Sequence, residues 1–308
     1  KIIIPGGAGY LGRYLAAHFA AQGYAVGVLT RRPQPNHETV RYVAWDGATR
    51  GAWAAELEGA AAVINLAGRS VNCRYNAQNR QAIYASRLDS TRVLGDAIAA
   101  CEQPPRVWLN ASSATIYGHA LDRPMDEASG EIGSGFSVDV CQQWERVFFE
   151  SATPHTRKAA LRTAIVLGKG RGGAMAPFRN LARLGRGGAM AGGKQYVSWI
   201  HTEDFARAVQ WIVEHDELSG PINVAAPMPR TNADFMRVLR LACKQPLGIP
   251  SARWMLEVGA FMLRTETELL LKSRRVVPAR LLQSRFAFHY PQLYDALRAI
   301  VTADHPMA

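Results

Sequence analysis

The strongest structural signal in the sequence is the segment Gly6-Gly7-Ala8-Gly9-Tyr10-Leu11-Gly12. It follows an apolar run, Lys1–Ile4, and leads into a helical pattern, Tyr10–Gln22. Gly6, Gly9 and Gly12 have the spacing G-x-x-G-x-x-G, which allows a tight turn, close approach of the backbone to a pyrophosphate, and close packing of helix on strand. Since this spacing lies between a strand and a helix, we predict a dinucleotide-binding turn rather than a structural glycine turn.

Outward from this turn, short β-branched runs alternate with longer helical patterns. The expected strands are Ala25–Thr30, Val40–Trp45, Ala61–Leu66, Val107–Ala111, Ala160–Leu167 and Pro221–Val224, and the expected helices are Gln78–Ala100, Val138–Ser151 and Asp204–His215. Continuously apolar strands separated by helices indicate a parallel sheet covered on both faces. We expect an α/β fold, a Rossmann-type doubly wound parallel sheet with a smaller, partly interleaved C-terminal lobe.

Composition excludes several classes of protein. The chain has 308 residues, 48% of them hydrophobic and 20% charged, as in ordinary globular proteins. Its four cysteines form no C-x-x-C or Cys/His cluster, so we expect no metal site, no disulfide framework and a reducing, cytoplasmic compartment. No secretory signal is expected, and the apolar stretch Trp254–Leu263 is too short to span a membrane. We therefore expect no membrane partner.

The chain is basic, with 36 Lys and Arg against 25 Asp and Glu, a formal charge of +11. This charge indicates either a generally basic surface or a phosphate-rich ligand. The cations are densest in Lys169–Lys194 and Lys272–Arg285. Because no helix-turn-helix, zinc-finger or RNP-type pattern accompanies them, we expect no nucleic-acid partner.

Thr30-Arg31-Arg32 ends the second expected strand, about twenty residues after the glycines. An acidic residue at this place would bind the ribose 2′-hydroxyl of NAD. Two guanidinium groups would instead clamp a 2′-phosphate, which predicts NADP as the cofactor. The alternative is a pair of solvated loop arginines.

Two further motifs follow expected strands. Asn65-Leu66-Ala67-Gly68 has small residues over which the adenine ribose and pyrophosphate can pass, although an ordinary strand–loop junction would look the same. Ser112-Ser113-Ala114-Thr115-Ile116-Tyr117-Gly118 places two hydroxyls where they can bind a substrate carbonyl, and its alternative is a serine-rich turn.

These motifs, in this order, resemble the short-chain dehydrogenase/reductase superfamily, in particular its extended and atypical branches, the nucleoside-diphosphate-sugar epimerase-like proteins. Further matches at Ser86-Arg87, Leu161–Gly168, Ser198–Asp204 and Pro278–Phe288 extend the resemblance over nearly the whole chain, toward a subgroup labelled "epimerase family protein". The expected domains are an NADP-binding domain, 1–168 with 196–226 returning to it, and a substrate-binding lobe, 169–195 and 227–308. The expected cofactor-binding residues are Gly6, Gly9, Tyr10, Leu11, Gly12, Thr30, Arg31, Arg32, Leu66, Ala67, Gly68, Arg87 and Val166.

One departure concerns catalysis. The resemblance implies a helix with Tyr-x-x-x-Lys, in which the tyrosine is the acid/base and the lysine holds the nicotinamide ribose and lowers the tyrosine pKa. When Glu145 is aligned with the glutamate that usually follows this motif, the tyrosine position falls on Ser137 and the lysine position on Cys141. We expect Glu145 itself to cap or pair. We expect Cys141 to be a packed helix residue rather than a nucleophile.

The remaining candidates for catalysis are Ser113, which matches the catalytic serine position, and Tyr117. His201 is a further candidate, with an interior histidine as its alternative. We expect an NADP(H)-binding short-chain dehydrogenase/reductase-like protein, either an epimerase or carbonyl reductase or, alternatively, a non-catalytic NADPH-sensing protein. The expected substrate is a small molecule, such as a sugar nucleotide, whose diphosphate would meet a basic cluster, and the expected state is monomer or homodimer. That cluster comprises Arg171, Arg179, Arg183, Arg186 and Lys194.

Overall fold

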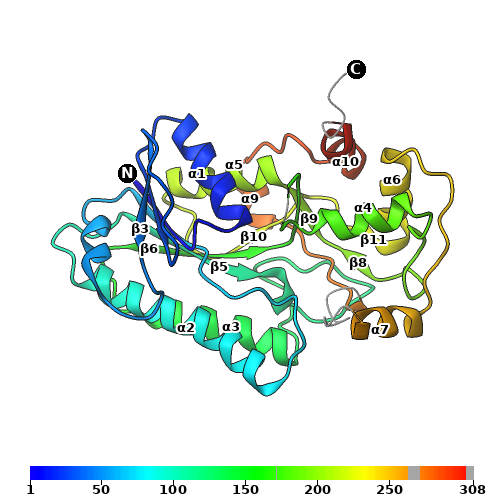
Figure 1. The fold of residues 1–308 in the computed structure, drawn as a ribbon, viewed down its shortest axis with the longest axis horizontal. Coiled ribbons are helices and arrows are strands. Elements are labelled where there is room, and N and C mark those ends of the chain that lie inside the picture. Colours follow the sequence, from blue (N-terminus) through cyan, green and yellow to red (C-terminus); the bar gives the residue numbers. More distant parts are fainter. Residues whose placement is uncertain (171, 263–270, 303–308) are drawn as a thin grey trace.

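The core of the fold is a parallel sheet, which Figure 1 shows edge-on. The structure is a computed structural model that describes residues 1–170, 172–262 and 271–302. The sheet has seven strands in the order β10-β6-β5-β4-β1-β2-β3, and every neighbouring pair is parallel. Its strands are β1 (Ile2–Pro5), β2 (Val26–Thr30), β3 (Val40–Ala44), β4 (Ala62–Asn65), β5 (Val107–Ser113), β6 (Arg157–Thr163) and β10 (Gly220–Val224). The predicted doubly wound Rossmann-type sheet is confirmed.

Helices cover both faces of the sheet. The helices α2 (Ala77–Ala99) and α3 (Phe136–Glu150) lie together on one face, and α1 (Tyr10–Ala21), α5 (Thr202–Glu214) and α9 (Ala279–Gln283) lie on the other (Figure 1). This double cover explains the uninterrupted apolar runs. Within β1, Ile2 and Ile4 join the core beneath α1 and α5, whereas Ile3 joins the core beneath α2 and α3; all three are fully buried.

The expected strand Ala160–Leu167 is wrong in one respect, because the chain changes partner at Ala164. The strand β6 ends at Thr163, and the Ala164 amide donates to the carbonyl oxygen of Val224. The next three residues form β7 (Ile165–Leu167), which pairs outside the main sheet with β9 (Trp199–His201). A continuous apolar run carries no mark of such a change.

A second hydrophobic core lies beyond β7. The glycine-rich segment, for which the sequence predicted no helix, contains α4 (Met175–Arg183), which packs with α6 (Asn232–Ala242) and α10 (Leu293–Thr302). The remaining elements are β8 (Tyr196–Val197), β11 (Arg230–Thr231), α7 (Arg253–Met262) and the 3₁₀ turns η1 (Ala52–Leu57) and η2 (Ala114–Ile116). The residue boundaries of the two expected domains stay predictions.

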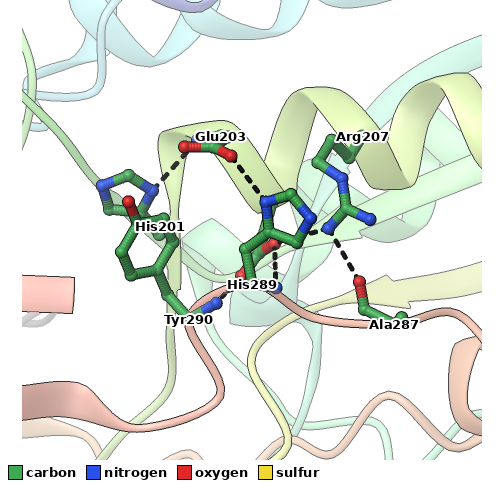
Figure 2. A network of polar contacts seen from close by, with 7 residues as sticks. His201, Glu203, Arg207, Ala287, His289 and Tyr290 are labelled. Carbon is green, nitrogen blue, oxygen red and sulfur yellow. Dashed lines mark hydrogen bonds and ion pairs between the residues drawn. The ribbon is translucent and has the colours of Figure 1, made fainter. Parts of the chain in front are cut away.

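The carboxylate of Asp204 joins the segment before α10 to the first turn of α5. Asp204 is fully buried and accepts the backbone amides of His289 and Tyr290, both at 2.8 Å, and Arg207 at 3.1 Å. Beside it His289 pairs with Glu203 at 2.7 Å, and Arg207 donates to the Ala287 carbonyl (Figure 2). The segment 287–290 is therefore fixed to α5, which packs on the main sheet.

The glycine turn after β1 has two distinct constraints. Gly6 has φ +75°, a left-handed conformation in which glycine is favoured. Gly12 packs against Gly7 so closely that an added Cβ would lie 2.5 Å from the Gly7 carbonyl oxygen. Gly9 is different, since it has an ordinary φ of −73° and an added Cβ would meet only the Gly6 oxygen, at 3.6 Å.

Across the helices that the structure describes, none combines the length and the apolar character that crossing a bilayer requires.

We predict that Gly12→Ala destabilises the protein by about 1–3 kcal/mol, because its Cβ meets backbone that cannot move aside. Gly9→Ala is the matched control and should cost less than about 1 kcal/mol, the usual range at a helix N-cap. Urea unfolding measures both changes. Equal effects for the two variants would contradict the packing role of Gly12.

Candidate functional site

The predicted cofactor motifs meet at one edge of the sheet. The glycine turn follows β1, Thr30-Arg31-Arg32 ends β2, Leu66–Gly68 follows β4 and Ser113 ends β5. These four strands are neighbours in the sheet, so their carboxyl ends lie side by side, and α/β proteins bind ligands in the crevice outside such strand ends. An added Cβ on Gly6 would lie 2.7 Å from the Ala67 amide nitrogen, which shows how closely the first and third motifs approach.

The N-terminus of α1 is suited to an anion. Its first amides have no acceptor within the helix, and no side chain caps them, because the N-cap residue is Gly9. The space beside the Gly9 Cα is open, so a phosphate can reach the backbone there. These features fit the pyrophosphate of a dinucleotide.

Beside this turn lies a cavity of about 600 Å³, lined by Ala8, Thr30, Arg31, Arg32 and Gln34. Both arginines are exposed and neither pairs with a carboxylate of the described residues. Thr30 is buried, and its hydroxyl oxygen accepts the Arg32 amide at 3.3 Å, which fixes the backbone between them. The cavity is therefore lined by two available guanidinium groups and no acidic side chain.

A buried network holds the Leu66–Gly68 turn. Asn65 accepts the Ala67 amide at 3.0 Å and donates to the Asn110 side chain at 2.7 Å. Thr91 of α2 lies beside both amides and accepts the indole N–H of Trp144 from α3 at 2.9 Å. Asn110 was not among the predicted site residues, although a polar residue within a buried apolar strand was an available signal.

The side chains of three predicted cofactor residues pack against other parts of the protein. The Tyr10 ring packs against the loop of Gly168 and Gly173, Leu11 packs at the edge of the core, and Val166 is buried in the core. Arg87, by contrast, lies directly beside Gly68, whose added Cβ would be 3.3 Å from the guanidinium carbon.

The two catalytic candidates differ in surroundings. Ser113 is half-buried; its hydroxyl caps η2, accepting the Thr115 amide at 3.1 Å and contacting the Thr115 hydroxyl at 3.0 Å. Tyr117 is 1% exposed, donates to the Asn223 side chain at 2.8 Å and accepts from Arg162 at 3.0 Å. Burial raises the pKa of the Tyr117 phenol. This geometry favours a structural role for Tyr117 and leaves Ser113 nearer the crevice.

The Tyr117 hydroxyl belongs to a second buried network, centred on Glu145 and Arg162. Two hydrogen bonds, of 2.8 and 2.9 Å, join the Arg162 guanidinium to the Glu145 carboxylate, which also accepts the Ser112 hydroxyl at 2.6 Å. Glu145 thus pairs, as the sequence predicted. The network ties α3 to β5 and β6 under Ser113.

The two positions of the missing catalytic pair are both buried. Ser137 is 9% exposed and Cys141 is 5% exposed, and both lie on α3. Burial raises the pKa of the Cys141 thiol to about 12, so the thiolate is suppressed at neutral pH. Cys141 is therefore a packed helix residue, as expected, and Val140, Trp144 and Phe148 are buried with it.

His201 takes the interior alternative. It is buried, its Nδ1 accepts the Glu203 amide at 3.2 Å at the start of α5, and its ring lies 4.0 Å from that of Tyr290 (Figure 2). Burial lowers the pKa of His201, which keeps the ring neutral and able to accept. Its local sequence could not reveal these partners, since Tyr290 is distant in the chain.

Residues 2–225 match a family model, the NAD dependent epimerase/dehydratase family. The chain belongs to this family. A second model, the domain of unknown function DUF1731, matches residues 252–300 of this epimerase-family chain. The resemblance inferred from the motifs is thereby confirmed.

Relatives of this epimerase-family chain match it from end to end. The human epimerase family protein SDR39U1 is 31% identical over 304 residues, 98% of this chain and 99% of that protein. An epimerase family protein of Mycobacterium leprae is 32% identical over 304 residues, 98% of this chain and 95% of that protein.

Solved structures agree with this assignment. The crystal structure of human SDR39U1 with NADPH has a TM-score of 0.87 at 30% identity, covering 97% of this chain and 98% of that one. UDP-N-acetylglucosamine 4-epimerase from Bacillus cereus shares the fold, with a TM-score of 0.77 at 18% identity and coverage of 98% of both chains.

We predict that Arg162→Met destabilises the protein by about 3–5 kcal/mol, because it leaves the Glu145 carboxylate buried without its cation. Adding Glu145→Leu should recover part of this loss. The control is Arg146→Met, a change at an exposed position of α3 next to Glu145, which we expect to stay within about 0.5 kcal/mol. Denaturant unfolding of the four proteins checks this, and similar stability for Arg162→Met and Arg146→Met would refute it.

Proposed function

We propose that the protein binds NADP(H) in the crevice at the carboxyl ends of β1, β2 and β4. The observation that carries this proposal is the cavity with Arg31 and Arg32 beside the uncapped glycine turn. Guanidinium pairs suit a 2′-phosphate, whereas the ribose 2′-hydroxyl of NAD favours a carboxylate. NADPH in the structure of human SDR39U1 supports the same choice.

We further propose an oxidoreductase or epimerase acting on a sugar nucleotide or other small carbonyl substrate. A bound nicotinamide supplies hydride exchange with a carbonyl or secondary alcohol. Ser113 would orient the reacting oxygen by a hydrogen bond, since it ends β5 at the crevice. Arg183, Arg186 and Lys194 are exposed in the second lobe and would attract a substrate diphosphate; Arg179 is half-buried and Arg171 lies outside the described residues.

A second candidate is an NADPH-sensing protein without turnover. Its specific support is helix α3, where the buried residues Ser137 and Cys141 stand at the tyrosine and lysine positions and the Cys141 thiol has its pKa raised to about 12. The buried Cys141 thiol stays protonated and uncharged at neutral pH, so it cannot supply the positive charge of the lysine, while the cofactor motifs still lie together at the strand ends. Cofactor binding is common to both candidates, and turnover separates them.

We expect NADPH to bind at least tenfold more tightly than NADH, about 1.4 kcal/mol, because charged hydrogen bonds form to the 2′-phosphate. Titration calorimetry of both cofactors measures the ratio. Replacing Arg31 and Arg32 together by Ala should abolish the preference. The control is Arg41→Ala, which should keep the preference for NADPH. Arg41 lies on β3, is exposed and pairs with Glu56. Equal affinity of the wild type for both cofactors would rule out the arginine clamp.

We expect slow or no turnover of sugar nucleotides and small carbonyls, since positioned acid–base catalysis contributes about 10²–10⁴-fold. NADPH oxidation measured by absorbance gives the rate. Any activity should fall in Ser113→Ala and persist in the control Ser129→Ala, an exposed serine bonded to Asp126. Joint Ser137→Tyr and Cys141→Lys changes should raise it. Fast turnover that survives Ser113→Ala would contradict the role of Ser113.

A further inference from the structure

The guanidinium of Arg87 is fixed by neutral partners. Arg87 lies on α2 and is half-buried; its Nη1 donates to the carbonyl oxygens of Ile83 and Arg69, both at 3.1 Å. The guanidinium carbon lies 5.0 Å from the ring centre of Trp144 on α3. Among the described residues no carboxylate pairs with it. A cation is thus held rigidly while its charge stays available to a ligand.

This cation lies between two parts of the crevice. On one side is Gly68, in the turn after β4, where an added Cβ would lie 3.3 Å from the guanidinium carbon. On the other side is the Trp144 ring of α3, and Cys141 lies one turn earlier on the same face of that helix. Burial raises the pKa of the Cys141 thiol, and the Arg87 charge opposes this rise. Arg87 therefore places positive charge where α3 itself has none.

Strand order shows which part of a dinucleotide would pass here. The Arg31–Arg32 cavity lies at β2 and the uncapped helix start at β1, while β4 and β5 lie on the opposite side of β1. Strands are spaced by about 4.8 Å, so the crevice runs about 14 Å from β2 to β5. A 2′-phosphate at β2 and a pyrophosphate at β1 direct the nicotinamide half over Gly68 toward Ser113.

We propose that Arg87 binds the nicotinamide half of the cofactor, supplying from α2 the positive charge that Cys141 leaves missing on α3. This inference rests on the proposed NADP(H) function and adds to it the residue that holds the reacting end. The proposal explains how the crevice orients nicotinamide without a lysine at 141.

The test compares two ligands that share the adenine half. NADPH contains both halves, whereas 2′,5′-ADP carries the 2′-phosphate and lacks the nicotinamide half. Calorimetry should show Arg87→Gln weakening NADPH about 10–100-fold, the usual effect of losing charged hydrogen bonds, with 2′,5′-ADP changed less than about twofold. Arg92→Gln is the matched control, because Arg92 is exposed on the same helix and pairs with Asp89. It should change neither ligand.

A charge exchange separates binding from a structural role. Adding Cys141→Lys to Arg87→Gln should restore NADPH affinity, since the cation returns from the neighbouring helix. If circular dichroism shows that Arg87→Gln does not fold, Arg87→Lys takes its place because it keeps the charge. The NADPH affinity of Arg87→Lys should stay within about tenfold of the wild-type affinity.

Two results would overturn the inference alone, provided the wild type binds both ligands. One is unchanged NADPH affinity in folded Arg87→Gln, and the other is equal weakening of NADPH and 2′,5′-ADP. If folding fails in Arg87→Gln, a loss of NADPH affinity beyond about a hundredfold in folded Arg87→Lys would overturn it too. A wild-type protein that binds neither ligand would instead overturn the proposed function, and the inference with it.

Discussion

The approach of the Gly6 backbone to the backbone of Ala67 is the constraint on which the cofactor crevice depends. It brings the turn after β1 and the turn after β4 into contact, with no room for a side chain between them. Once these two turns meet, the start of α1 points its free amides into the crevice and Gly68 is carried against Arg87. A larger residue at position 6 would separate the turns and be strained by the positive φ as well.

Buried polar groups keep those turns in place from below. Asn65, Asn110, Thr91 and Trp144 connect two strands to two helices. Glu145 and Arg162 do the same one strand further along, where β5 ends at Ser113. Such networks are costly when incomplete, so they specify one arrangement of strand ends rather than adding much net stability. The crevice is therefore shaped by polar contacts under an apolar sheet.

Much of this was predictable from the sequence, because the signals were local. The glycine spacing at 6–12 and the alternation of strands and helices predicted the parallel sheet, and the motif at Arg31-Arg32 marked a position that does line a cavity. The distant contacts of Tyr117 and His201 were not predictable. Their partners, Asn223 and Tyr290, lie about ninety or more residues away, and only the folded chain brings them together. The break at Ala164 was hidden for a related reason, since an apolar run does not show which strand it pairs with.

The position of β10 affects how the chain folds during synthesis. This strand ends at Val224 and completes the edge of the sheet beside β6, which ends about sixty residues earlier. At about 5–20 residues per second, that interval lasts roughly 3–12 s. Until β10 emerges, β6 presents an unpaired edge and the Tyr117 hydroxyl lacks Asn223. A nascent chain of this topology therefore has an interval in which strand pairing between molecules competes with completion of its own sheet.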